Sequence, residues 1–171
     1  MKAKKVLKLL QVTRPTLCSY VRKGYIKTFV MPSGRYEYDD NSVYEFMGIK
    51  NRDVAIYSRV PVNDPIKLDE QLKHCNDYAA SRNYNVTKTY SEIACGYDID
   101  RKGFLDLLHE VTEYKIRTLI IACKEALVTT GFNAWADIFK ENGCEIMIAD
   151  GYEMPEGSAQ IEIDKFVNEM N

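Results

Sequence analysis

Short apolar runs alternate with amphipathic stretches over residues 53–171. Apolar and β-branched runs predict strands at residues 54–60, 86–90, 118–123 and 145–149. Apolar positions that recur every three or four residues predict helices at residues 65–81, 101–112, 133–142 and 158–170. Strands that alternate with helices favour a parallel sheet. The pattern therefore predicts an α/β fold in which a mainly parallel sheet is flanked by helices.

Residues 1–50 follow a different pattern, which begins with two short helices. Val6 and Leu10 fall on the buried face of a first helix whose lysines remain exposed. Thr13 is a good N-cap for a second helix, and Leu17 lies on the apolar face of that helix. A short connection between two such helices is typical of a helix-turn-helix unit.

A hairpin and a third helix complete this N-terminal segment. Gly24 is expected to end the second helix. Two extended runs, residues 26–30 and 35–38, flank the turn Pro32-Ser33-Gly34. Asp40 or Asn41 is the expected cap of the third helix. We therefore expect a winged helix-turn-helix head at residues 1–50 and a second domain at residues 53–171.

Charge divides the chain at the same place. Residues 1–52 carry 11 Lys and Arg against 4 Asp and Glu, a net charge of +7. Residues 53–171 carry 12 against 21, a net charge of −9. Basic side chains that neutralise phosphates release counterions and so gain affinity for nucleic acid without reading its sequence. The charge pattern favours double-stranded DNA as the partner of the head.

The composition gives no reason to expect a metal or another cofactor. The five cysteines form no CxxC pair, which favours reduced thiols in a cytoplasm. The most apolar run, residues 119–123, is too short to cross a bilayer, and the lysine-rich start lacks the apolar core of a signal peptide. We expect a cytoplasmic protein without a membrane segment.

The head resembles the winged helix-turn-helix of MerR-type proteins. The resemblance lies in residues 9–14, 32–36 and 42–46, together with Leu17, Tyr20 and Gly24. It implies that the second helix enters the major groove while the wing touches the flanking backbone. The implied DNA contacts are Arg14, Thr16, Ser19, Arg22, Lys23 and Arg35. A protein-binding module with merely solvated charges is the alternative, and the net charge of +7 favours DNA.

Three blocks of the second domain resemble the resolvase and invertase class of serine recombinases. The blocks are residues 56–60 with Gln71, residues 92–96 leading to residues 101–103, and residues 119–121 followed by Lys124 and Glu125. A MerR-like head in front of such a domain is the arrangement of one transposase subgroup of that family. The resemblance implies a serine after the first strand that attacks DNA phosphate, arginines that clamp the phosphate, and a tetramer that exchanges strands.

The catalytic residues implied by this resemblance are only partly present. Arg59, Gln71 and Arg101 match an arginine near the nucleophile, a helix glutamine and a phosphate-binding arginine, and Glu125 stands for the usual aspartate. Four positions depart from the pattern. These are Pro61 at the serine position, Cys95 in place of a serine, and Ala126 and Thr129 in place of two arginines. Proline has no hydroxyl, and phosphoryl transfer also needs positive charge against the phosphate oxygens. We therefore expect vestigial, inactive machinery.

Other nucleophiles have weak support. Ser58 alternates with Arg59 along the strand and should point to the opposite face, as a small buried polar group. Cys95 is more readily explained as a buried, inert thiol. His74 and His109 lie on predicted helices without a partner in a catalytic spacing.

Two hypotheses therefore remain for the whole chain. The first is a non-catalytic DNA-binding protein of the serine recombinase family, which we expect to be a homodimer and to be able to form a tetramer on DNA. The second is an active recombinase or transposase for DNA integration that uses another nucleophile or a mixed tetramer. The apolar residues of the last helix favour self-association, although docking within the chain would explain the same pattern. These residues are Ala159, Ile161, Ile163, Phe166 and Val167.

Overall fold

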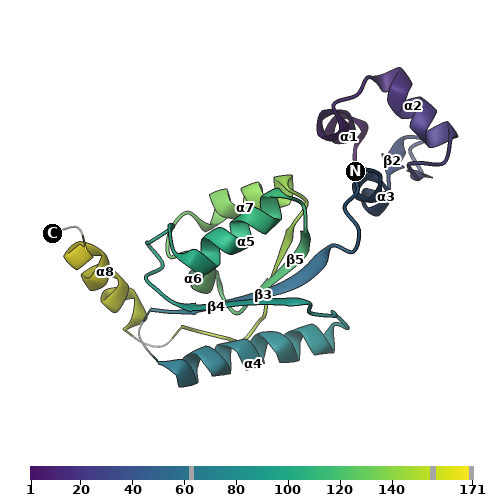
Figure 1. The fold of residues 1–171 in the computed structure, drawn as a ribbon. Coiled ribbons are helices and arrows are strands. Elements are labelled where there is room, and N and C mark those ends of the chain that lie inside the picture. The colour runs from purple at the N-terminus through teal and green to yellow at the C-terminus, as the bar shows by residue number, and fades with distance from the viewer. Residues whose placement is uncertain (62–63, 155–156, 170–171) are drawn as a thin grey trace. The chain divides into compact units, whose positions relative to one another are not determined.

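The computed structural model describes residues 1–61, 64–154 and 157–169, and these residues form two compact units. The first unit is Met1–Asn51 and the second is Arg52–Asn171. Figure 1 shows the head, in purple and dark blue, as helices and a hairpin, and the second unit as a sheet with helices on both faces. No helix in the described part of the chain is long and apolar enough to cross a membrane.

The head contains three helices and one hairpin in the predicted order. The elements are α1 (Ala3–Leu10), α2 (Arg14–Arg22), β1 (Thr28–Val30), β2 (Tyr36–Tyr38) and α3 (Asp40–Phe46). Val6, Leu17, Ile26 and Val43 are buried together at its centre. Each helix contributes one of these side chains, so the small core fixes the three helices against one another.

Two capping predictions for the head were wrong in detail. The cap of α3 is Asp39, whose carboxylate accepts from the backbone N–H of Ser42 at 3.0 Å, and neither Asp40 nor Asn41 has this role. Thr13 occupies the N-cap position of α2, but its hydroxyl bonds with the Thr16 hydroxyl at 2.9 Å instead of capping a backbone N–H. The helices still begin within one residue of the predicted positions, because a neighbouring Asx or Thr satisfies the same backbone geometry.

The second unit is built on a four-stranded, fully parallel sheet. Its strands are β3 (Asp53–Val60), β4 (Lys88–Ile93), β5 (Ile116–Ile121) and β6 (Glu145–Ile148), in the order β4-β3-β5-β6. The helices are α4 (Pro65–Ser81), α5 (Lys102–Thr112), α6 (Lys124–Leu127), α7 (Phe132–Glu141) and α8 (Ser158–Glu169). The predicted α/β class and the mainly parallel sheet are confirmed.

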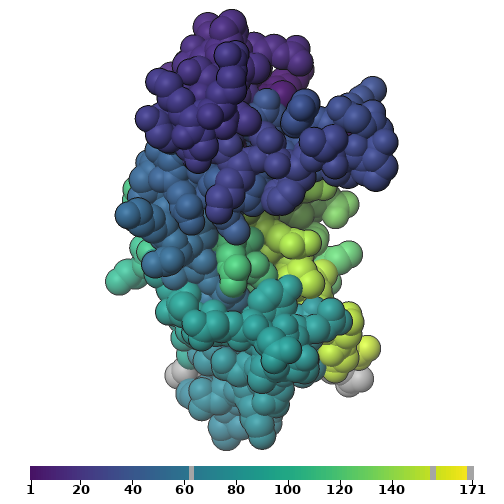
Figure 2. Space-filling model, turned by 90° about the vertical axis from the view of Figure 1, so that its right-hand side faces the viewer, coloured from purple at the N-terminus to yellow at the C-terminus, as the bar shows by residue number. Residues whose placement is uncertain are grey.

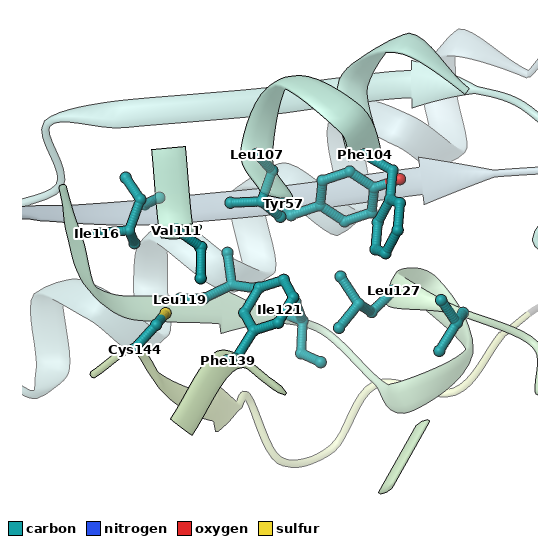
Figure 3. Packing of buried hydrophobic residues seen from close by; sticks show 12 residues of the cluster. Tyr57, Phe104, Leu107, Val111, Ile116, Leu119, Ile121, Leu127, Phe139 and Cys144 are labelled. Atoms are coloured by element: carbon teal, nitrogen blue, oxygen red, sulfur yellow. The ribbon is translucent and has the colours of Figure 1, made fainter. Parts of the chain in front are cut away.

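Both faces of the sheet are covered, as a parallel sheet requires. On one face, Tyr57 and Leu119 pack with Phe104 and Leu107 of α5 and Phe139 of α7, as Figure 3 shows. On the other face, side chains of β3 and β5 pack against α4 through Cys75 and Ala79. Helix α4 matches its predicted span, and the Asp64 carboxylate accepts from Lys67 N–H at 3.1 Å as its cap.

Two features of this unit differ from the expectations. The ladder of β4 begins at Lys88, because Tyr84 and Val86 are used earlier to pack against the α4 side of the core. Helix α6 was not predicted, since four residues are too few to show a helical period. This short helix immediately follows β5 and forms part of the edge where the strands end.

Candidate functional site

The carboxyl ends of β3 and β5, together with α6, form one edge of the sheet, which we call the rim. Arg59, near the end of β3, donates to the carbonyl of Glu125 and, at 3.2 Å, to that of Ala126, both in α6. Pro61 directly follows the strand and is buried. Parallel strands end at one edge, so residues distant in sequence meet there. At this rim the side chain of Arg59 meets the main chain of α6.

Arg59 is a buried guanidinium that is already occupied by protein acceptors. Its side chain has no exposed surface. Besides the two α6 carbonyls, it donates to Ala94 O at 2.9 Å and to Glu162 Oε1 at 2.6 Å. Its backbone N–H donates to Gln71 Oε1 at 2.7 Å, which explains the complete burial of Gln71. A guanidinium has five N–H groups, and four acceptors leave little capacity for a ligand.

Glu162 of α8 is a member of this site that the sequence did not reveal. It is only 2% exposed, and its second carboxylate oxygen accepts from the Thr129 hydroxyl. The Cys95 thiol lies 3.5 Å from the backbone carbonyl of Glu162. Ser158, Glu162 and Lys165 are spaced by four and three residues, so they share one side of the helix. This polar side was not predicted to be buried, because the neighbouring apolar residues suggested self-association.

Arg101 belongs to a second internal network next to the rim. It is 4% exposed, and its Nε donates to Tyr57 Oη at 2.8 Å and to Glu92 Oε1 at 3.0 Å. Its terminal nitrogens donate to the carbonyls of Asp98 and Leu127. Burial is the main reason that the pKa of Tyr57 is raised, so its phenol stays protonated and accepts from Arg101. This arginine ties β3 and β4 to the start of α5.

The remaining candidates are placed less favourably for chemistry. The backbone carbonyl of Glu125 accepts from Arg59 at the rim, while its side chain is exposed to solvent. Ser58 is fully buried beside the Cys75 thiol, on the opposite face of the strand, as predicted. Burial raises the pKa of that thiol to about 12, so it is protonated at neutral pH.

The two histidines show no catalytic arrangement. His74 lies 3.3 Å from the carbonyl of Ala149, and His109 is exposed and pairs with Glu113 at 3.3 Å. In the described part of the chain, neither imidazole bonds to a hydroxyl or thiol that it could activate. Among the residues described, no group of three His, Cys, Asp or Glu side chains is suited to hold a metal ion.

Gly96 allows the rim to close around Arg59, and its replacement tests that packing. A Cβ at this position would lie 2.0 Å from Thr129 Oγ1 and 2.6 Å from Arg59 Nη2. We expect Gly96→Ala to lower the free energy of unfolding of the second unit by about 3 kcal/mol, the upper range for overpacking. Urea denaturation measures the change. Gly131→Ala, where a Cβ meets nothing within 4 Å but the backbone φ is +70°, is the control and should show only the smaller conformational cost. Equal losses of stability in the two variants would show that the residues around Arg59 can move to accommodate the extra methyl group.

A separate candidate site is a groove on the head. It has a volume of about 830 Å³ and lies between the start of α1, α2 and the hairpin. Arg14 and Arg35, both predicted as DNA contacts, line it together with Lys2 and Lys4, which were not among the predicted contacts. Glu37 is the only acidic side chain among the lining residues. The groove is therefore strongly cationic.

The other predicted head residues lie away from the groove lining. Arg22 and Lys23 are exposed at the end of α2, while Thr16 and Ser19 are half-buried on the same helix. The hairpin adds exposed apolar side chains, with Val30 65% and Tyr36 62% exposed. Figure 2 shows the surface of the head in purple and dark blue. The head thus presents a basic helix edge, a cationic groove and an exposed hairpin.

Comparison with known proteins assigns the second unit to a family. Residues 54–171 match the family model described as "Resolvase, N terminal domain". The chain belongs to the resolvase family of serine recombinases. A resolvase-named protein of Acanthamoeba polyphaga mimivirus is 26% identical over 132 residues, which are 75% of this chain and 66% of that relative. The chain therefore spans slightly less than two thirds of the length of this relative.

Solved structures agree with the resolvase assignment. The C-terminal catalytic domain of ISC1926 TnpA, an IS607-like serine recombinase, is 27% identical with a TM-score of 0.60, covering 69% of this chain and 80% of that one. The first open reading frame of transposon ISC1904 from Sulfolobus solfataricus P2 shares the fold, at 24% identity and a TM-score of 0.61, over 69% and 82% of the two chains. The resolvase resemblance inferred from sequence is confirmed.

Proposed function

We propose that this resolvase-family chain binds double-stranded DNA through its head and does not cut it. The proposal that the chain does not cut DNA rests on the residues at and next to the rim. Pro61 offers no hydroxyl, and the guanidiniums of Arg59 and Arg101 are buried and bonded to protein oxygens. The arginines at the family's catalytic positions thus have a structural role in this chain.

The chemistry of DNA cleavage needs two things that this rim does not supply. A nucleophile must attack phosphorus, and positive charge must stabilise the equatorial oxygens as the bonds change. The charge of Arg59 is matched by Glu162 at 2.6 Å, which would also repel a phosphate approaching the same donor. Losing one well-placed donor commonly costs about 3 kcal/mol of transition-state stabilisation, and here the nucleophile is missing as well.

The head supplies the surface for DNA. Helix α2 and the residue that follows it offer their polar side chains to the major groove, as helix-turn-helix proteins do with their second helix. These side chains are Arg14, Thr16, Ser19, Arg22 and Lys23. The adjoining groove, with Lys2, Lys4 and Arg35, is suited to the sugar–phosphate backbone that borders the major groove. A net charge of +7 on residues 1–52 supports the same partner. The second helix, the cationic groove and the net charge together support a head of the MerR-like type.

Self-association is the expected mode of binding. Helix-turn-helix proteins usually contact paired half-sites as symmetric dimers, which favours a homodimer, and the family supports a tetramer on DNA. Helix α8 leaves apolar side chains in solvent, with Ile161 38% and Ile163 43% exposed. The outward orientation of most apolar residues of α8 supports self-association over docking of this stripe within the chain.

A covalent-linkage assay separates this proposal from an active recombinase. Duplexes bound by the wild-type chain are selected from a random-sequence pool, incubated with the protein, and denatured with detergent before electrophoresis. We expect no protein–DNA adduct from the wild type, and none from Pro61→Ser, because Arg59 and Arg101 remain engaged with protein oxygens.

The outcomes of this assay point to different functions. An adduct formed by the wild type and lost in Ser58→Ala or Cys95→Ala would identify that residue as the nucleophile and establish a recombinase. An adduct that appears only when an intact family member is added, and that contains the added protein alone, would favour a mixed tetramer. Failure to select any duplex would refute the role of the head in binding DNA.

A further inference from the structure

Strand β4 forms an open lateral edge of the parallel sheet. It is the outer strand in the order β4-β3-β5-β6 and pairs with β3 on one side. Its pairing with β3 runs from Lys88 to Ile93 without a bulge. The strand at the opposite edge, β6, has four residues, against six for β4. A regular edge strand of this length offers its outer backbone groups as a template for a further strand.

The backbone groups that face away from the sheet belong to Thr89, Ser91 and Ile93. In a parallel ladder, a residue bonds to the two neighbours of its partner, so bonded and outward-facing residues alternate along the strand. Val60 is the partner of Ile93, and its carbonyl accepts from Ala94 N–H at 3.1 Å. The residues of β4 that bond to β3 therefore have even numbers. Among the described residues, none outside the sheet accepts from the N–H of Thr89 or Ser91, and both residues are exposed.

The side chains of β4 follow a pattern that is symmetric about Tyr90. The segment reads Lys88-Thr89-Tyr90-Ser91-Glu92. Two antiparallel copies centred on Tyr90 set each lysine against a glutamate and each threonine against a serine. Opposite charges, hydroxyl pairs and aromatic pairs directly across two strands all stabilise a sheet. This self-complementarity favours a second copy of the same strand over an unrelated peptide as the partner of the edge.

We infer that β4 pairs antiparallel with β4 of a second copy of this chain, in a register centred on Tyr90, so that the two sheets join across a twofold axis. Thr89 then faces the partner's Ser91, and since both residues point outward, each such pair exchanges both of its N–H···O bonds. Lys88 and the partner's Glu92 take a position without backbone bonds, where side chains lie closer together. A shift by two residues would set Lys88 against Tyr90 or Ala94 and lose this charge pair.

The two charged side chains keep the capacity to pair across this interface. The Lys88 ammonium donates to Glu110 at 2.5 Å and lies 3.4 Å from Asp53, and an ammonium has three N–H donors. The Glu92 carboxylate accepts three bonds from its own unit and has about four lone-pair sites. Their side chains are 33% and 13% exposed. Because bonds within the unit already hold both charges in place, their pairing costs little further side-chain entropy.

This inference goes beyond the proposed function and does not depend on DNA binding by the head. The interface uses no residue of α8 or of the head. An isologous contact between two β4 strands closes at two copies. A chain that associates through both β4 and α8 has two separate self-association surfaces, which assembly beyond a dimer requires.

Disulfide trapping tests the register. All chains carry Cys18→Ser, because Cys18 is exposed and the other four cysteines are buried. Thr89→Cys and Ser91→Cys chains, one of them with a size tag, are mixed in the presence of oxidised glutathione. The register places these two positions about 5.5 Å apart between Cα atoms, within disulfide range. We expect the mixed disulfide to form at least about tenfold faster than either homodimer, because like positions lie on a diagonal of about 7 to 8 Å.

Equal rates in the mixed and single samples would overturn the register centred on Tyr90. A complete lack of disulfide-linked chains in all samples would overturn the pairing of β4 itself. Both cysteines replace exposed side chains, so neither change is expected to disturb the fold.

Replacing Ser91 with proline tests the backbone bonds. The Ser91 N–H faces outward, so proline removes a donor of the edge and none of the ladder with β3. We expect Ser91→Pro to weaken self-association at least about tenfold, because each copy loses one bond at the interface. Ser91→Ala, which keeps the N–H, is the matched control and should stay within about threefold of the wild type. Sedimentation equilibrium over a range of protein concentrations measures the association.

Self-association of Ser91→Pro as tight as that of Ser91→Ala would overturn the interface. Association through α8 contributes equally to both variants, so their difference reports on β4. Trp135 fluorescence in urea verifies that Ser91→Pro folds. If it does not fold, the disulfide rates decide the question. A failure of the head to bind DNA would refute the proposed function and leave both of these results unchanged.

Discussion

Replacing Arg59 with methionine is expected to lower the free energy of unfolding of the resolvase-type unit by about 3 to 5 kcal/mol. The change removes the cation that pairs with Glu162 and leaves the carbonyls of Ala94, Glu125 and Ala126 without this donor. Urea denaturation followed by fluorescence measures the effect selectively. The single tryptophan, Trp135, packs against the core of this unit, so its signal reports on the unit itself.

Arg117→Met is the matched control for this measurement. Arg117 is an exposed arginine of β5, and its replacement should change stability by less than about 0.5 kcal/mol. A loss below about 1 kcal/mol for Arg59→Met would mean that water readily replaces the guanidinium at the rim. That result would weaken the conclusion that Arg59 has become a structural residue, and it would reopen the possibility that it binds substrate.

The position of Arg59 could be predicted from the sequence, but the partners of its guanidinium could not. The position of Arg59 at the end of a buried strand was predictable, because an apolar run and a following proline mark where the strand stops. Its family match suggested a phosphate ligand. Whether a guanidinium faces solvent or backbone carbonyls depends on long-range contacts such as those with Ala94 and Glu162, which no local pattern encodes.

Helix α8 illustrates a second kind of limit. Its existence and its start at Ser158 followed from periodicity, but its orientation did not. Periodicity shows that apolar and polar residues occupy different faces, and the usual assumption is that the apolar face is buried. Here a buried, charged partner attracts Glu162 and reverses the assignment. Only the three-dimensional position of Arg59 reveals that partner.

The lysines of the head were missed for a related reason. Lys2 and Lys4 were taken as the solvated side of the first helix, which is the usual role of such residues. The structure places them in one groove with Arg14 and Arg35, contributed by three separate elements. The sequence could predict that the head is basic, but the convergence of these charges required the packing of α1, α2 and the hairpin.

Removing Arg14 and Arg22 together is expected to weaken DNA binding by about 60-fold at 0.1 M salt and to flatten its salt dependence. Each phosphate contact contributes about 0.9 to the slope of log K against log salt, so two lost contacts reduce the slope by about 1.8. Fluorescence anisotropy with a labelled duplex at several salt concentrations measures both quantities. Both arginines are exposed, so Arg14→Ala with Arg22→Ala should leave the head folded.

The control removes the same charge from the other unit. Lys102→Ala with Arg117→Ala takes two exposed cations from the resolvase-type unit and should leave affinity and slope close to those of the wild type. Equal losses in the two double variants would contradict a DNA interface confined to the head, and would show that DNA also contacts the second unit. Lost affinity with an unchanged slope would mean that Arg14 and Arg22 contact base edges rather than phosphates, because only phosphate contacts release counterions.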